Sequence, residues 1–211
     1  MEKMVMAKLL EIHPQNPQNR LIKQVVDELN AGGVIVYPTD SGYALGTALG
    51  NKEGLGRIRG IRNLSKRHDF TLMMRDLSHI GEYAKLDNNA FRLLKKVLPG
   101  AYTFILQGTR DVPKRLLHPK KKTIGLRIST HSVVQAILGL LDVPLMSVSL
   151  ILEGHEFYNI QDVREVLGNK VDMIIDDGYC IPEPTTVIDL SSGNIEIIRQ
   201  GAGDISIEAF A

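Results

Sequence analysis

The sequence contains almost no cysteine and no long apolar run, and each absence excludes a class of protein. Cys180 is the only cysteine among the 211 residues, which excludes an intramolecular disulfide framework and a cysteine-based zinc site. No apolar run approaches the length of a transmembrane helix, and the segment from Met1 to Leu10 has no stretch long enough for a signal peptide. We therefore expect a cytoplasmic protein that does not bind membranes.

Several common catalytic and nucleotide-binding motifs are also missing. There is no Gly-x-x-x-x-Gly-Lys-Ser/Thr loop, no Gly-x-Gly-x-x-Gly after a strand and no Gly-x-Ser-x-Gly. The six histidines are scattered without the spacing of metal ligands. We interpret Cys180 as a small buried apolar residue and the pair Asp176-Asp177 as a solvated turn. The net charge of +1 means that any affinity for phosphate or nucleic acid must come from local clusters.

What the chain does contain is a regular alternation of helical and strand patterns. From Asn19 to Gly33, for example, apolar residues recur at helical spacing, and a short apolar run typical of a strand follows. This interleaving continues along the chain and indicates an α/β fold with a largely mixed sheet. No repeat or linker divides the sequence, so we predict a single domain over residues 1–211.

One stretch, Val34 to Gly46, places polar residues at the end of a predicted strand. The apolar run Val34–Tyr37 suits a buried strand, and Pro38, which lacks a backbone donor, is expected to end it. The small oxygen-bearing residues 39–41 follow, at the position where open α/β sheets bind ligands. Two interpretations stay open: a binding site, or a hairpin-like corner whose side chains only satisfy nearby backbone groups.

Much of the positive charge lies in two clusters. The first lies on the second predicted helix and just beyond its end, and comprises Arg57, Arg59, Arg62, Lys66 and Arg67. The second precedes the strand that ends at Arg127 and comprises Lys114, Arg115, Lys120, Lys121 and Lys122. Each cluster could neutralise phosphates, or each could be a solvated face. Strand ends and one helix end could together form a polar, cationic crevice, made by Thr39, Arg127, Ser147, Ser149 and Arg62.

Several segments, taken together, resemble the motifs of the YrdC-like family. They are Tyr37-Pro-Thr-Asp-Ser-Gly-Tyr-Ala-Leu-Gly46, Pro99-Gly-Ala-Tyr-Thr103, Gly125-Leu-Arg-Ile-Ser-Thr-His131, Pro184-Thr-Thr-Val-Ile-Asp-Leu190 and Ile198-Arg-Gln-Gly201. They occur in the family's order and span almost the whole chain. Phe70-Thr-Leu72 and Ser147-Val-Ser149 are most similar to the YciO subgroup. The resemblance implies a YrdC-type twisted mixed β-sheet flanked by helices, with a concave basic surface.

The resemblance also implies an activity and its partners. Characterised members of the family are threonylcarbamoyl-AMP synthases, which use ATP, L-threonine and bicarbonate on the way to threonylcarbamoyladenosine in tRNA. We expect Mg²⁺ to accompany the ATP, held mainly by phosphate oxygens and water. The family domain is also associated with double-stranded RNA and tRNA. The alternative hypothesis is therefore an RNA-binding protein without catalysis.

The family's site residues carry over by position. The amino-acid contacts fall on Thr39, Arg127 and Thr185. The nucleotide contacts fall on Arg62, Lys66, Thr123, Ser147 and Arg199. The candidate RNA or phosphate contacts are Arg59, Arg67, Lys120, Lys121 and Lys122. Attack on an α-phosphate needs charge neutralisation and alignment more than a protein nucleophile, so we assign no catalytic residue.

Two positions depart from the family pattern. The family's Lys-x-Arg is Arg62-Asn63-Leu64 here, and its Ser-x-Asn is Ser147-Val148-Ser149. Loss of a polar clamp in a dry site costs about 1–3 kcal/mol. Two explanations stay open: a weakened synthase reaction, or another acyl, amino-acid or nucleotide ligand.

Overall fold

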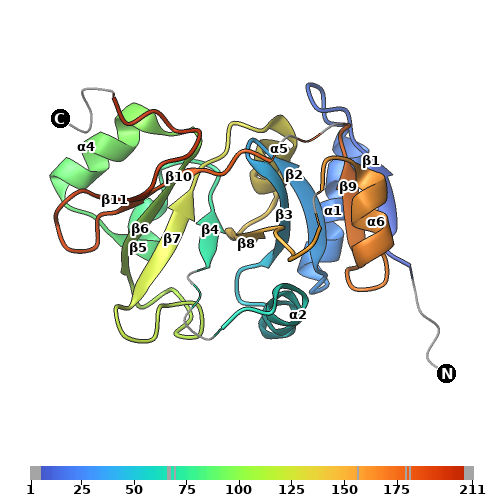
Figure 1. The fold of residues 1–211 in the computed structure, drawn as a ribbon, viewed down its shortest axis with the longest axis horizontal. Coiled ribbons are helices and arrows are strands. Elements are labelled where there is room, and N and C mark those ends of the chain that lie inside the picture. The colour runs from blue at the N-terminus through green and yellow to red at the C-terminus, as the bar shows by residue number, and fades with distance from the viewer. Residues whose placement is uncertain are drawn as a thin grey trace.

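The protein folds around one large sheet that runs along the long axis of the molecule (Figure 1). The structure is a computed structural model, and it describes residues 6–65, 68, 70–155, 157–178, 180 and 182–206. The helices are α1 (Asn19–Asn30), α2 (Lys52–Arg62), α3 (Ile80–Tyr83), α4 (Asn88–Val97), α5 (Ser132–Leu140) and α6 (Ile160–Leu167). None of the helices in these described ranges is long and apolar enough to cross a lipid bilayer.

The strands alternate with these helices along the chain. They are β1 (Lys8–Glu11), β2 (Ile35–Thr39), β3 (Gly42–Ala48), β4 (Thr71–Met73), β5 (Ala84–Lys85), β6 (Tyr102–Gly108), β7 (Thr123–Arg127), β8 (Leu145–Ser149), β9 (Met173–Asp176), β10 (Thr186–Asp189) and β11 (Glu196–Arg199). Their order in the sheet is β1-β9-β2-β3-β8-β4-β7-β6-β10-β11, with β5 beside β6. Parallel and antiparallel pairs are mixed, so the predicted α/β class with a mixed sheet is confirmed.

Side-chain caps fix where several helices begin. The Asn51 side chain accepts a hydrogen bond from the Gly54 amide at the start of α2, at 3.0 Å. The Asp87 carboxylate does the same for the Ala90 amide at the start of α4, at 2.7 Å. Such caps satisfy amides that have no partner inside the helix. They explain why polar residues in the sequence coincide with helix boundaries.

Alternation along β2 divides the apolar core between the two faces of the sheet. Val34 and Val36 belong to the cluster that also contains the buried residues of α2, α4 and α6. Ile35 and Tyr37 belong to the cluster beneath α1 and α5. Successive side chains of a strand point to opposite faces, so a continuous apolar run marks a strand covered on both sides.

The face beneath α1 and α5 is apolar over only part of the sheet. Its apolar cluster contains residues of β1, β9, β2, β3 and β8 and ends at Met73 of β4, without a residue from β6, β7 or β10. On the same face β7 carries Thr123, Gly125 and Arg127, and β8 carries Ser147. This half of the face therefore presents small and polar side chains.

Strand β2 does not end at Pro38 as predicted. Pro38 pairs with Tyr43, and the ladder continues to the pair Thr39–Gly42. On its other side β2 pairs with β9 only through Ile35 and Val36. Pro38 lies beyond the reach of β9, so its missing amide hydrogen removes no ladder bond, as expected for a proline at a sheet edge.

The twist of the sheet brings together two strand ends that a flat sheet would separate. Arg127 of β7 pairs with Met73 of β4. Through Leu145 of β8, the same row of the sheet reaches Ala48 of β3. Ala48 lies at the end of β3 away from the hairpin, roughly 20 Å along the strand. Arg127 nevertheless contacts Asp40 in the hairpin turn at 2.5 Å. The sheet must therefore curve strongly toward this face, as large twisted sheets do.

Candidate functional site

The β2–β3 hairpin turn forms one wall of the candidate site. The Thr39 hydroxyl accepts a hydrogen bond from the Ser41 amide at 3.1 Å and donates to the Gly42 carbonyl at 2.7 Å. Gly42 has a φ of 106°, a conformation that suits glycine. The Thr39 hydroxyl thus orders the turn itself, in line with the hairpin interpretation. Thr39 is 5% exposed.

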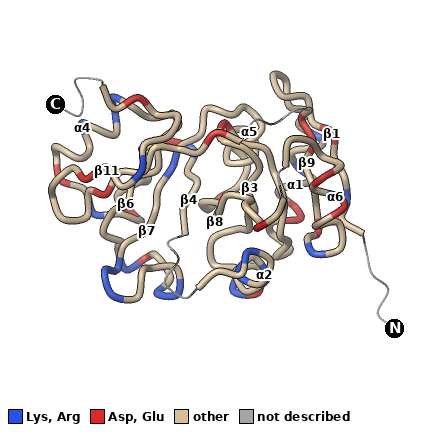
Figure 2. Tube along the Cα trace, viewed as in Figure 1, with Lys and Arg blue, Asp and Glu red and all other residues tan. Residues whose placement is uncertain are grey.

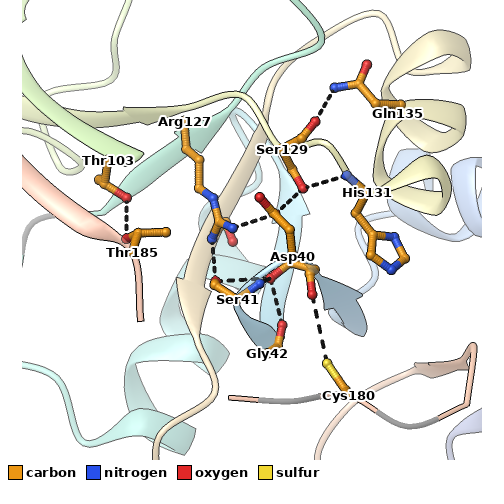
Figure 3. Close-up of polar contacts among 12 residues, drawn as sticks. Asp40, Ser41, Gly42, Thr103, Arg127, Ser129, His131, Gln135, Cys180 and Thr185 are labelled. Atoms are coloured by element: carbon orange, nitrogen blue, oxygen red, sulfur yellow. Dashed lines mark hydrogen bonds and ion pairs between the residues drawn. The ribbon is translucent and has the colours of Figure 1, made fainter. Parts of the chain in front are cut away.

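Arg127 enters this turn from β7 (Figure 3). Its guanidinium donates to Asp40 Oδ1 at 2.5 Å and to the Ser41 hydroxyl at 2.7 Å. Ser129 also donates to Asp40 Oδ1. The side chains of Arg127 and Asp40 are only 7% and 15% exposed. The result is a buried ion pair, here called the Asp40–Arg127 pair.

The Asp40–Arg127 pair is not saturated. Among the described residues, Asp40 Oδ2 and Arg127 Nε are both buried and have no hydrogen-bond partner. A buried polar group without a partner costs about 1–3 kcal/mol, so native proteins rarely keep one without a ligand or water to satisfy it. Within the described residues, the pair therefore keeps one acceptor and one donor that no protein group satisfies.

A second polar link extends the network toward β9. His131 donates its backbone amide to the Ser129 hydroxyl at 3.1 Å, and its Nε2 lies 2.8 Å from Asp177 Oδ2. The Asp177 side chain is 8% exposed, so the expectation of a solvated turn at Asp176-Asp177 is wrong for Asp177. The reason is tertiary: His131, which directly precedes helix α5, brings its imidazole to the end of β9.

Cys180 closes the site on the side of the segment after β9. Its thiol lies 3.9 Å from the Thr39 carbonyl, and the residue is 5% exposed. Burial raises the pKa of the thiol to about 11. The interpretation of Cys180 as a small buried residue is confirmed.

Thr185, the third predicted amino-acid contact, lies at the start of β10. Its hydroxyl is 2.9 Å from the Thr103 hydroxyl of β6, as Figure 3 shows. Its carbonyl accepts two hydrogen bonds from the Arg199 guanidinium, at 3.1 and 2.8 Å. Arg199, predicted as a nucleotide contact, thus binds the backbone beside Thr185.

Two predicted nucleotide contacts lie on the polar half of the sheet face. The Ser147 hydroxyl is 2.6 Å from the hydroxyl of Tyr37, and both residues are buried. Burial raises the pKa of Tyr37 to about 12. Thr123 is fully buried, and within the described part of the chain its hydroxyl has no partner.

The arginines of α2 bind oxygen atoms of the protein itself. Arg57 pairs with Asp172 at 2.5 Å. Arg59 lies over the Phe70 ring, 5.2 Å from its centroid, and donates to the Arg115 carbonyl at 3.0 Å. Arg62 donates to the Ile151 carbonyl, and partial burial lowers its pKa. The predicted contacts Lys66 and Arg67 lie outside the described residues.

The lysines before β7 are exposed. Lys121 Nζ lies 3.7 Å from Asp189, and Lys122 Nζ donates to the Pro119 carbonyl at 2.7 Å, while Lys120 is also exposed. Figure 2 shows basic residues gathered on α2 and on the loop before β7, along the lower edge of the view. The two clusters thus share one edge of the molecule.

Sequence reasoning did not assign four residues of this network. Asp40, Ser129, His131 and Asp177 connect Arg127 to the end of β9. Asp40 and His131 lie inside quoted motifs, so their polar character at strand and helix boundaries was an available signal. Asp177 had no such signal, because its partner is distant in sequence.

Comparison with known proteins places the chain in a family. A family model for the Sua5, YciO and YrdC proteins, described as telomere recombination, matches residues 27–201. The chain belongs to this Sua5/YciO/YrdC family. The YciO protein of Escherichia coli K12 is 50% identical over 202 residues, covering 95% of this chain and 98% of YciO. The predicted YrdC-like family and YciO subgroup are confirmed.

Solved structures agree with the Sua5/YciO/YrdC assignment. The crystal structure of Escherichia coli YciO has a TM-score of 0.92 at 48% identity and covers 98% of this chain and all of that one. A structure of P. abyssi Sua5 complexed with L-threonine has a TM-score of 0.84 at 21% identity, covering 92% of this chain and 57% of Sua5. A putative threonylcarbamoyl-AMP synthase of Methanocaldococcus jannaschii is 28% identical over 198 residues, covering 92% of this chain and 93% of the synthase.

Proposed function

We propose that this YciO-like chain is an ATP-dependent synthase of the threonylcarbamoyl-AMP type, acting on L-threonine, bicarbonate and ATP. The observation that carries the proposal is the Asp40–Arg127 pair, with its unpartnered carboxylate oxygen and guanidinium nitrogen in the described structure. An α-amino acid carries a carboxylate acceptor and an ammonium donor on one carbon atom. It can therefore satisfy both groups at once, which a plain anion or cation cannot do.

Arginine is well suited to the carboxylate side of this recognition. Its planar guanidinium presents several donors in a fixed geometry, and such charge-assisted bonds are stronger in a water-poor site. Arg127 is held in place by Asp40 and Ser41 at 2.5 and 2.7 Å, so little side-chain freedom is left to lose when a ligand binds. We expect the hydroxyl groups of Thr39, at the end of β2, and Thr185, just before β10, to contact the amino acid as well.

The proposed reaction needs no protein nucleophile. The threonine ammonium group first loses a proton to water, and the resulting amine condenses with bicarbonate to a carbamate, releasing water. A carbamate oxygen then attacks the α-phosphorus of ATP, and pyrophosphate leaves. The protein contributes positioning and charge neutralisation, which dominate phosphoryl-type transfers. The nucleotide enters as its Mg²⁺ complex, with the cation held by phosphate oxygens and water.

The names of relatives support the same reaction class. One relative is named a putative threonylcarbamoyl-AMP synthase, and another solved structure contains L-threonine. Within this chain, Arg62 is bound to the Ile151 carbonyl, and Leu64 replaces a family cation. We therefore expect weaker nucleotide binding than in synthases that keep both cations.

A turnover assay tests the proposal. Purified protein is incubated with L-threonine, bicarbonate and α-labelled MgATP, and pyrophosphate and the labelled adenylate are measured. The expected result is pyrophosphate release that requires both threonine and bicarbonate. Release that is independent of threonine, or no release where a family synthase is active, contradicts the proposal. L-Serine and L-valine serve as competing substrates that lack the methyl or the hydroxyl group.

A second candidate function, binding of double-stranded RNA or tRNA without catalysis, is favoured by the exposed basic loop before β7. Lys120, Lys121 and Lys122 are exposed there, near the basic face of α2 (Figure 2). Phosphate contacts of this kind give affinity that falls steeply with salt. The two functions are separable, because RNA binding does not require the Asp40–Arg127 pair.

A further inference from the structure

Tyr37 and Ser147 form a buried hydroxyl pair that reaches across a whole strand. Tyr37 lies on β2 and Ser147 on β8, with β3 between them. Their hydroxyl oxygens are 2.6 Å apart. Gly46 of β3 makes this possible, because a Cβ at that position would lie 2.8 Å from the Tyr37 ring. The tyrosine ring thus crosses β3 over a glycine.

The chemistry of the two hydroxyls decides which one donates. Tyr37 is fully buried and has no other hydrogen-bond partner among the described residues, so its O–H must point at Ser147 or remain unsatisfied. A phenol is also a much stronger acid, and therefore a better donor, than an aliphatic alcohol. Burial raises the pKa of Tyr37 to about 12, so its hydroxyl group stays protonated at neutral pH. Tyr37 therefore donates and Ser147 accepts.

This direction fixes the role of Ser147. With a lone pair of its oxygen occupied, Ser147 has its own hydrogen free to donate. Its side chain lies on the face that also carries Arg127, and the register places Thr71 and Gly125 between the two. A Cβ at Gly125 would lie 2.7 Å from the Thr71 hydroxyl, so this stretch of the face admits only small groups. Tyr37 is the one hydrogen-bond partner of the Ser147 side chain among the described residues, so the Ser147 hydrogen is left for a group on the polar half of the face, which also carries Arg127.

We propose that Tyr37 is a positioning residue that holds Ser147 as a fixed hydrogen-bond donor, so that this point of the site selects an acceptor such as a nucleotide phosphate oxygen. The inference rests on the proposed function, because it takes the nucleotide as the ligand beside Ser147. It assigns Tyr37 an indirect role, without contact to the substrate. It also predicts that a ligand group with only donor hydrogens is disfavoured there.

A double-mutant cycle tests this role. Binding of MgATP is measured by calorimetry for the wild type, Tyr37→Phe, Ser147→Ala and the double variant. Each single change is expected to weaken binding about 5- to 10-fold, the usual worth of one hydrogen bond. The double variant should bind no more weakly than Ser147→Ala alone, because Tyr37 acts only through Ser147. The proposal is overturned if the double variant loses affinity by the product of the two single losses, or if Tyr37→Phe binds MgATP like the wild type.

Two further variants separate positioning from general damage to the fold. Gly46→Ala should reproduce the loss of Tyr37→Phe, because its methyl group displaces the tyrosine ring. Tyr102→Phe is the matched control: it removes a tyrosine hydroxyl that donates to the Asp204 carbonyl, and it should leave MgATP binding unchanged. Equal weakening by Tyr102→Phe also counts against the proposal. Failure of the wild type to bind MgATP would refute the nucleotide half of the proposed function, and this role with it.

Discussion

The polar residues of this protein form two regions that differ in density and in burial. The basic edge, made of α2 and the loop before β7, holds most of the clustered cations, yet its arginines bind protein carbonyls and a carboxylate. The Asp40–Arg127 pair contains a single arginine, but that arginine is 7% exposed and binds a carboxylate whose other oxygen has no partner within the described structure. The comparison teaches that cations clustered in the sequence are not thereby available to a ligand, because the arginines of α2 already bind oxygen atoms of the protein.

The physical reason is the cost of desolvation. Exposed cations keep most of their hydration and contribute little to stability, so a sequence can carry many of them without a specific use. A buried ion pair loses its hydration and is kept only with good geometry and additional hydrogen bonds. The buried Asp40–Arg127 pair, whose Asp40 Oδ2 and Arg127 Nε have no partner among the described residues, is therefore more informative about a binding site than the exposed cations are.

The largest expected effect comes from breaking the buried pair. Arg127→Ala should abolish threonine-dependent turnover, because the hydrogen-bond donor to the substrate carboxylate is gone. It should also lower the free energy of unfolding by roughly 3–5 kcal/mol, since Asp40 is left as a buried charge without its partner. Urea unfolding and pyrophosphate release measure the two effects.

A double variant separates these two losses. Arg127→Ala combined with Asp40→Asn removes the unpaired charge, so part of the stability should return while turnover stays absent. Turnover in any folded variant without Arg127 would show that the site lies elsewhere. Arg57→Ala is a matched control from the basic edge. Its ion pair is about one third exposed, so its loss should cost stability of only about 1 kcal/mol and spare turnover.

Cys180 provides an intermediate test of how closed the buried region is. The thiolate is the reactive form, and burial raises the pKa of this thiol from 9.0 to about 11. At pH 8 alkylation by iodoacetamide should be about 100-fold slower in the folded protein than in the urea-unfolded chain, in proportion to the thiolate fraction. The folded rate should rise about tenfold per pH unit until the pH approaches 11. Equal rates in both states would mean that the segment after β9 does not shield the hairpin.

The smallest expected effect concerns the basic edge. Replacing Lys120, Lys121 and Lys122 together by Ala should leave stability and threonine-dependent turnover nearly unchanged, because these side chains are exposed. If RNA binds there, affinity should fall and the dependence of its logarithm on salt should lose about one unit of slope for each phosphate contact removed. Filter binding across a salt series measures this. An unchanged slope would mean that the loop does not contact phosphate.

Local patterns in the sequence predicted most of the secondary structure. The apolar run at Val34–Tyr37, predicted as a buried strand, overlaps β2, which is covered on both faces, because strand formation depends on neighbours a few residues away. Pro38 shows the limit of such reasoning. A rule about proline in strands needs the identity of the neighbouring strand, and β9 does not extend that far.

The candidate site was only half predictable. Thr39, Arg127 and Thr185 were chosen by resemblance, and their roles as ligand contacts stay predictions. The sequence contained no sign that Asp177 would meet His131 or that Tyr37 would meet Ser147, because these partners are 46 and 110 residues apart. Hydrogen bonds over such separations depend on strand order, which single-sequence periodicity does not specify.

The sequence by itself determined the class of fold and the family, since the first follows from the alternation of helical and strand patterns and the second from motif order. Only the tertiary structure decided that Arg127 meets Asp40. The two residues lie on strand ends that the register alone would separate by roughly 20 Å, and the curvature of the twisted sheet closes that distance. Curvature is a property of the whole sheet, built up from small rotations between neighbouring strands, and no single stretch of sequence contains it.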